Sequence, residues 1–225
     1  MQNIAVAQST YESMPIFPLP DFVVYPNTVT RLRVFESRYR LLTADVLAGN
    51  RLMVLVGLKP GYQDDYYGSP PIFQVGSLCK VVNEERLDDG CYNLSLHCLA
   101  RVEIERVHRL KPYRVATVNQ LPDIIEPAED LEETISRLTS CIRGLVMQLG
   151  DADGLLLNEL HTKRKPDILT NRLATYLARE PGDRQRLLEE PSVKARAERL
   201  TDIVGDMMLR SVQMGLSGET ELLVN

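Results

Sequence analysis

The stretch that decides the fold is Cys91-Tyr-Asn-Leu-Ser-Leu-His-Cys98, in which apolar and polar side chains alternate. Successive side chains leave a β-strand on opposite faces, so this period of two predicts a half-buried strand. Val102 and Ile104 continue the same alternation further along the chain. On the other side, Asp89-Gly90 suits the positive φ angles of a tight turn and joins the stretch to a second strand-like run over 75–83. The sequence therefore predicts an antiparallel hairpin at the centre of its first half.

Outward from this hairpin, further segments of the first half also read as strands. Leu32 and Val34 alternate with arginines, and residues 52–58 form a short apolar run. Val115 and Thr117 mark one more strand. The first half is therefore predicted to be rich in β-structure and antiparallel in part.

One helix and one long loop interrupt the predicted strands. A helix is predicted over 37–48, because Tyr39, Leu42 and Val46 share one face of it. Residues 59–71 contain glycine and proline breaks around a polar-aromatic run that has neither helical nor strand periodicity. A surface loop of this length is expected to be functional or mobile.

The period changes in the second half, after a proline-rich and acidic boundary over 122–130. An amphipathic helix is predicted there from apolar residues at steps of three and four, namely Leu131, Ile135, Leu138, Ile142, Leu145 and Leu149. Asp130 and Glu133 resemble a capping box at its start, and Gly150 fits its end. Further helices are predicted near 155–160, from Pro166 to before Pro181, near 183–188, and from 192 to about 214.

The predicted architecture is thus of the α+β class. Its parts are a flexible N-terminus over 1–12, a β-rich lobe with one inserted helix over 13–122, a helical bundle over 123–215 and a flexible C-terminal tail over 216–225.

The bulk properties disfavour several classes of protein. A net charge of −5 provides no overall basic field for nucleic acid. The chain shows neither a secretory signal nor an apolar run of about 18 residues, so we predict a cytoplasmic protein without a membrane span. The 4 cysteines never form a Cys-x-x-Cys pair, which favours reduced thiols packed in the core over a disulfide framework or a zinc site.

No catalytic, cofactor or metal site can be assembled from the sequence. A nucleotide-binding P-loop needs Gly-Lys-Ser/Thr, and none of the 13 glycines precedes a lysine. The serine-elbow motif and clustered metal ligands are also missing. We therefore predict no catalytic residue, no metal and no cofactor. A small hydrolase that uses His97 or His161 with a carboxylate stays open as a weaker alternative.

Several segments, in order, resemble the N-terminal domain of Lon proteases. Met14-Pro-Ile-Phe-Pro-Leu-Pro-Asp-Phe-Val-Val-Tyr-Pro-Asn-Thr28 is similar to the opening of that domain. The further matching pieces are 34–39, 75–81, 89–94, 99–104, 166–174 and 184–189. One departure is Ala100, where the family often has glycine before the arginine.

The resemblance implies a PUA-like β-barrel, of the type named after pseudouridine synthase and archaeosine transglycosylase, together with a helical bundle. It also implies a non-catalytic module that recognises unfolded or tagged polypeptide segments, standing alone without the ATPase and Ser–Lys protease domains. Such a module could act as an adaptor or regulator in proteolysis, with a protease or chaperone as a further partner. The oligomeric state is not indicated.

Recognition of non-native chains requires exposed apolar or aromatic surface. The candidate residues come from the turn near 22–26 and from the long loop, namely Phe22, Val24, Tyr25, Tyr62, Tyr66 and Tyr67. Two alternatives stay open, that the turn is buried in the barrel and that the loop is simply solvated.

RNA binding is the alternative function. It would use a basic cluster formed by Arg31, Arg33, Arg38 and Arg40, which could follow a phosphate backbone. A solvated face whose charges pair with nearby acids explains the same cluster.

Overall fold

The computed structural model describes residues 9–66, 68–108, 112–149 and 154–222. The chain forms two compact units, which are described separately. One unit, the barrel unit, combines the residues up to Pro122 with Glu180–Pro191. The other, the helical unit, combines Asp123–Arg179 with the residues from Ser192 onward.

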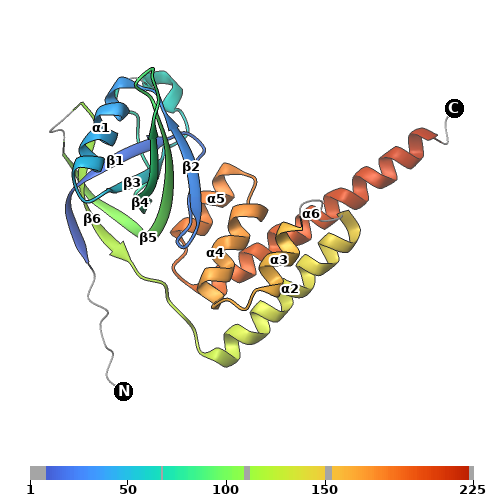
Figure 1. The fold of residues 1–225 in the computed structure, drawn as a ribbon. Helices are drawn as coiled ribbons and strands as arrows, with labels where there is room; N and C mark the ends of the chain where they lie inside the picture. Colours follow the sequence, from blue (N-terminus) through green and yellow to red (C-terminus); the bar gives the residue numbers. More distant parts are fainter. Residues whose placement is uncertain (1–8, 67, 109–111, 150–153, 223–225) are drawn as a thin grey trace. The chain divides into compact units, whose positions relative to one another are not determined.

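The barrel unit is built on one six-stranded sheet (Figure 1). Its strands are β1 (Thr10–Leu19), β2 (Val29–Val34), β3 (Leu52–Gly57), β4 (Val75–Arg86), β5 (Tyr92–His108) and β6 (Arg114–Leu121). They follow the order β2-β5-β4-β3-β1-β6, and β5 also pairs with β6, which closes the sheet into a barrel. The β1–β3 pair is parallel and the other pairs are antiparallel.

The alternation in the opening stretch appears as β5, the longest strand. Its even-numbered residues from Leu94 to Cys98 are buried, and Gly90 takes a φ of 76° in the turn from β4. The first half of β5 pairs with β2, and its residues from Arg101 onward pair with β6, with a register shift between Ile104 and Arg106. The predicted hairpin is therefore part of a longer strand that joins both sides of the barrel.

Helix α1 (Ser37–Ala48) has the predicted bounds and packs on the barrel. It buries Tyr39, Leu42 and Val46, and the Tyr39 ring stacks on Phe17 of β1 with centroids 4.2 Å apart. The described residues of the loop between β3 and β4, 58–66 and 68–74, include the 3-10 turn η1 (Tyr62–Asp65). We call this segment the β3–β4 loop.

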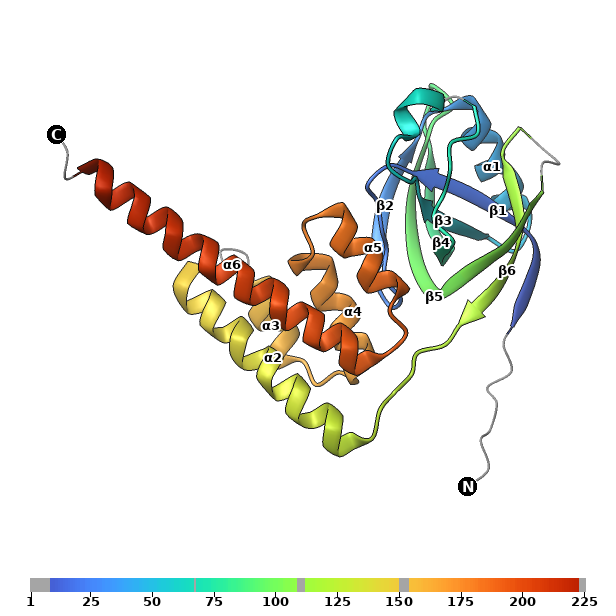
Figure 2. The ribbon, with the colours of Figure 1, turned by 180° about the vertical axis from the view of Figure 1, so that it is seen from behind.

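The helical unit contains α2 (Ala128–Leu149), α3 (Leu155–His161), α4 (Pro166–Leu177) and α6 (Val193–Leu222). Helices α2 and α6 run side by side in both views (Figures 1 and 2). The predicted stripe of α2 faces the core, since Leu138, Ile142 and Leu145 are almost fully buried. The apolar period thus placed this helix correctly.

Four details differ from the expectations. Helix α2 begins at Ala128, so Asp130 lies inside its first turn and is not a cap; the Pro127 carbonyl accepts the Leu131 N–H instead. The expected stop at Gly150 is not one of the four, because it lies outside the described residues. Helix α6 continues to Leu222, beyond the end near 214, and β1 begins at Thr10, inside the segment expected to be a flexible terminus.

The fourth difference concerns α5 (Pro181–Glu189), which we assigned to the bundle but which belongs to the barrel unit. The Gln185 side chain donates to the Val75 carbonyl at 3.1 Å, and the Tyr25 hydroxyl donates to the Arg184 carbonyl at 3.0 Å. The helical period of α5 was readable, but its long-range hydrogen bonds were not.

Candidate peptide-binding site

The β3–β4 loop is fixed at both ends by backbone hydrogen bonds. The Lys59 N–H donates to the Pro71 carbonyl at 2.9 Å, and the Phe73 N–H donates to the Gly57 carbonyl at 3.0 Å. Within the loop, the Asp65 carboxylate accepts the Ser69 N–H at 2.9 Å. A long segment, whose regular structure among the described residues is the single turn η1, is thereby fixed at its ends, and it lines two pockets of the barrel unit.

The first of these, the apolar pocket, has a volume of about 230 Å³. Aromatic, aliphatic and proline side chains dominate its wall, among them Phe22, Leu58, Pro60, Tyr62, Phe73 and Pro181. The candidates Phe22 and Tyr62, which are 40 positions apart in the sequence, therefore meet here. Both side chains are half-buried.

One polar side chain lies among the apolar walls of this pocket. Gln185 of α5 is only 4% exposed, and its Nε2 donates to the Val75 carbonyl and to the Glu189 carboxylate. Its Oε1 is buried and accepts no hydrogen bond from the described residues. Leaving a buried acceptor unsatisfied costs about 1–3 kcal/mol, which a donor on a ligand would recover.

Gly57 keeps space open beside this acceptor. A Cβ at that position would lie 3.0 Å from the Phe73 ring and 3.4 Å from Gln185 Oε1. A larger residue would therefore crowd the pocket wall.

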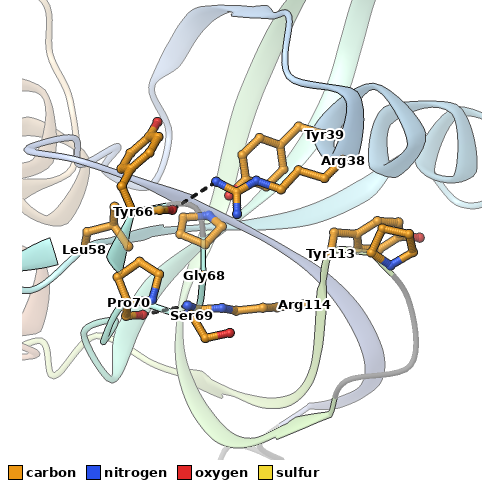
Figure 3. A pocket seen from close by; sticks show the side chains of 11 residues that line it. Arg38, Tyr39, Leu58, Tyr66, Gly68, Ser69, Pro70, Tyr113 and Arg114 are labelled. Atoms are coloured by element: carbon orange, nitrogen blue, oxygen red, sulfur yellow. Dashed lines mark hydrogen bonds between the residues drawn. The ribbon is translucent and has the colours of Figure 1, made fainter. Parts of the chain in front are cut away.

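The second, the polar pocket, has a volume of about 210 Å³ and is lined by Tyr66 and residues 68–70 of the loop (Figure 3). Arg38 from α1 and Arg114 from β6 extend their guanidinium groups toward the loop. Arg38 Nη2 donates to the Tyr66 carbonyl at 3.3 Å, and Arg114 Nη2 donates to the Pro70 carbonyl at 2.6 Å. Both arginines thus hold loop carbonyls in place.

The Glu36 carboxylate balances part of this positive charge. It accepts from Arg38 Nε at 3.0 Å and from the Tyr66 hydroxyl at 3.1 Å. The Arg38 guanidinium also lies 4.6 Å from the centroid of the Tyr39 ring, a cation–π distance. Burial raises the pKa of Tyr39 to about 12, so its phenol is neutral at any physiological pH. Arg38 is therefore held at the polar pocket by its contacts with Glu36, Tyr39 and the Tyr66 carbonyl.

Two sequence-based candidates are not available to a ligand. Val24 is 4% exposed and Tyr25 is 2% exposed, because the turn that carries them packs into the barrel. Burial raises the pKa of Tyr25, whose hydroxyl is occupied by the Arg184 carbonyl. For these two residues the alternative of burial is the correct one. Tyr66 lines the polar pocket, and Tyr67 lies outside the described residues.

The basic cluster of the sequence does not form one face. Arg31 and Arg33 lie on β2, with exposed side chains, whereas Arg38 is part of the polar pocket. Arg40 donates to the Asp89 carbonyl at 3.1 Å, and Arg33 pairs with the Asp89 carboxylate at 3.5 Å. Arg38 is thus separated from the other three, of which Arg33 and Arg40 contact Asp89 and Arg31 does not.

Comparison with known proteins decides the family. Residues 13–206 match the ATP-dependent protease La (LON) substrate-binding domain. The chain belongs to that family. The resemblance seen in the sequence is confirmed, and the match is to the substrate-binding domain, not to a catalytic domain.

Relatives of this LON substrate-binding domain include Lon protease 1 of Herpetosiphon aurantiacus. It is 29% identical over 216 residues, which is 91% of this chain and 25% of the relative. Lon protease 2 of Sorangium cellulosum is 29% identical over 201 residues, which is 86% of this chain and 24% of the relative. The chain thus spans about a quarter of the length of these relatives.

Solved structures show the same fold. The N-terminal domain of a Mycobacterium avium complex Lon protease aligns with a TM-score of 0.68 at 16% identity, covering 87% of this chain and 99% of that one. A Lon N-terminal domain protein from Xanthomonas campestris aligns with a TM-score of 0.59 at 22% identity, covering 84% and 97%. The α+β prediction is therefore confirmed.

The described part of this LON substrate-binding domain offers neither a metal-binding cluster nor a membrane-spanning helix. No group of three or more His, Cys, Asp or Glu side chains there could hold a metal ion, and no helix there is long and apolar enough to cross a membrane. His97 and His161 lie in different units. The thiols of all 4 cysteines are free, and three of them are buried, as expected for core-packed residues.

Sequence reasoning missed several residues of the two pockets, namely Leu58, Phe73, Arg114 and Gln185. Leu58 and Phe73 flank the predicted loop over 59–71, but nothing in the sequence showed that their side chains line the apolar pocket. Gln185 lies in the segment 184–189, which did carry the family resemblance. That resemblance was the one available signal for it.

Proposed function

We propose that the barrel unit binds non-native polypeptide segments by taking one apolar side chain into the apolar pocket. The observation that carries this proposal is the meeting of Phe22 and Tyr62 with Leu58 and Phe73 around one opening. Membership of the LON substrate-binding domain family supports a polypeptide as the ligand.

The size and chemistry of the pocket support a side chain as its occupant. Its volume of about 230 Å³ is below the roughly 300–1,000 Å³ usual for small-molecule sites. Burying a leucine or phenylalanine contributes about 1.5–3 kcal/mol. The unpaired Oε1 of Gln185 offers an acceptor for a donor near that side chain, such as a main-chain N–H. Each such contact is weak, which suits a module that samples many sequences.

The test uses a fluorescein-labelled peptide with one phenylalanine among glycines and serines, and a second peptide with serine in its place. We expect only the first to bind in fluorescence anisotropy. Phe22→Ala and Tyr62→Ala should each weaken it about tenfold, equivalent to about 1.4 kcal/mol. Leu209→Ala, which removes a leucine that is 63% exposed in the helical unit, is the matched control. Equal binding of both peptides, or wild-type affinity of both pocket variants, would contradict the proposal.

Several finer statements extend this function. We propose an adaptor or regulator role in proteolysis, with a protease or chaperone as partner and a cytoplasmic location; a pull-down from native cells read by mass spectrometry tests them. Absence of catalysis stays a prediction, and ATP or peptide turnover that a point mutation abolishes would contradict it. RNA binding stays the alternative, and it predicts an affinity that falls steeply with salt.

A further inference from the structure

Strand β2 is the one strand of the described sheet with a neighbour on a single side. It pairs with β5 from Val29 to Val34, and no described strand pairs with its other edge. The other strands each have at least two neighbours, and β5 has three. An open edge of this kind is a template for an additional strand, because its main-chain donors and acceptors lack protein partners.

The register shows which groups face outward. The Cys98 N–H donates to the Thr28 carbonyl at 3.0 Å, which makes these two residues a hydrogen-bonded pair. Hydrogen-bonded and non-bonded pairs alternate in an antiparallel ladder. Thr30, Leu32 and Val34 therefore bond to β5, whereas the main-chain N–H and C=O of the odd-numbered residues Val29, Arg31 and Arg33 point away from it.

The odd-numbered side chains of β2 are exposed, and two of the three, Arg31 and Arg33, are basic, whereas Val29 is apolar. Arg31 has no ion-pair partner within the described residues, and Arg33 has only the exposed Asp89 carboxylate at 3.5 Å. Their cross-strand neighbours on β5, Ser95 and Asn93, are uncharged. Glu85 of β4 lines a pocket together with both arginines, and its carboxylate accepts a hydrogen bond from Asn93 at 2.9 Å. The free edge of β2 thus combines unpaired main-chain groups with positive charge.

This charge pattern selects among the possible occupants. A second copy pairing antiparallel through β2 would set arginines of the two chains opposite one another whenever Arg31 faces Arg31 or Arg33, which is unfavourable. An extended segment with glutamate or aspartate at alternate positions places carboxylates beside both guanidinium groups. Main-chain hydrogen bonds supply the rest of the binding energy and require no particular sequence.

We propose that the free edge of β2 binds an extended, acidic polypeptide segment as an added strand. The inference rests on the proposed function only in taking a polypeptide as ligand. It concerns a different surface, since none of the residues that line the apolar pocket belongs to β2.

The decisive experiment follows amide hydrogen exchange by NMR on the full chain, with and without a fluorescein-labelled peptide of alternating valine and glutamate. The peptide should slow exchange at Val29, Arg31 and Arg33. It should leave Thr30 and Leu32, which already bond to β5, unchanged. Exchange slowed evenly along β2, or only at residues of the apolar pocket, would refute strand addition.

Two substitutions at one position separate main chain from charge. Arg31→Ala removes the charge and keeps the N–H, and should weaken the valine–glutamate peptide about threefold, as for an exposed ion pair. Arg31→Pro removes the charge and also an outward N–H that β5 does not use, so it should abolish binding of the peptide. The variant should still fold, because proline is tolerated on edge strands. Equal affinity of the two variants, with folding verified by circular dichroism, would count against the added strand.

Other ligands and the pocket are distinguished in the same assay. A valine–lysine peptide should bind at least tenfold more weakly, and Phe22→Ala should leave the valine–glutamate peptide unaffected. An oligouridylate that displaces the peptide without slowing the three amides would assign the arginines to nucleic acid and overturn the proposal. Slow exchange at these amides without peptide, together with a dimer in sedimentation, would assign the edge to a second copy. If only the phenylalanine peptide fails to bind, the proposed function is contradicted and the strand-addition inference is not affected.

Discussion

Replacing Glu159 with glutamine should destabilise the helical unit by about 2–3 kcal/mol, because this carboxylate holds two arginines from inside the core. The Glu159 side chain is 2% exposed, and it accepts from Arg164 Nε at 2.9 Å and from Arg172 Nε at 2.6 Å. Arg172 adds a second bond through Nη2, which makes the pair bidentate. The substitution keeps the shape of the side chain and removes its charge.

The magnitude follows from how exposed the partners are. Removing one member of a fully buried ion pair costs about 3–5 kcal/mol. The side chains of Arg164 and Arg172 are 26% and 27% exposed, so water can solvate part of the charge left behind. Glutamine also keeps one acceptor oxygen, and both effects bring the expected cost below that range.

The pKa of Glu159 adds a second, independent signature. The hydrogen bond from Arg172 is the largest cause that lowers this pKa in the folded protein. A lowered folded-state pKa contributes stability at pH values above the ordinary glutamate pKa of about 4.3, and this contribution is lost as the pH falls through the folded-state value. The difference between wild type and Glu159→Gln should therefore shrink in acid.

The assay is urea unfolding followed by the helical circular dichroism signal, at neutral pH and in acid. Glu198→Gln is the control, because the exposed pair of Glu198 with Arg137 at 3.9 Å should contribute about 0.5 kcal/mol or less. A Glu159→Gln effect as small as the control, or one that does not change with pH, would refute this account of the buried carboxylate.

Three further predictions concern the barrel unit. Gly76→Ala should lower the free energy of unfolding by about 1–3 kcal/mol, since its Cβ would lie 2.7 Å from the Leu55 carbonyl oxygen; a thermal melt unchanged by the substitution would contradict this. Cys79 should resist iodoacetamide in the native protein while the half-buried Cys141 reacts, because a hydrogen bond with Cys98 and burial raise the pKa of Cys79. Mass spectrometry of the labelled sites tests this, and equal labelling of both thiols would contradict it. Tyr39→Phe should leave the tyrosine absorbance rise near pH 10 unchanged, since burial raises the pKa of Tyr39 to about 12; a smaller rise would show an exposed phenol.

Local periodicity was sufficient to predict most elements. Alternation placed β5, the stripe from Leu131 to Leu145 placed α2, and Pro166 marked the first turn of α4. Such signals depend only on which side of one element is buried, and this is written into the spacing of apolar residues. Closure of the sheet through β5 and β6, and the attachment of α5 to the barrel unit, depend on contacts between distant segments and leave no period in the sequence.

The two pockets show the same limit at a finer scale. Phe22 and Tyr62 were chosen for their chemistry, but burial rather than chemistry separates Phe22 from Val24, two positions away. The turn directs one apolar side chain to the pocket and the other to the core. Composition cannot distinguish these outcomes, because both sides of the turn require apolar residues.

The arginines show why neighbours in the sequence are not neighbours in function. Arg33 lies near the end of β2 and Arg40 lies in the following helix, yet both contact Asp89, which lies in a turn about fifty positions away. Arg38, which lies between them in the sequence, lines the polar pocket, because residues two positions apart on a helix face in different directions. What remains of the apparent basic patch is Arg31 with Arg33, on a strand whose outer edge has no described partner. The strand-addition proposal depends on these two charges lying beside an open edge, where an added strand would place its own side chains next to them.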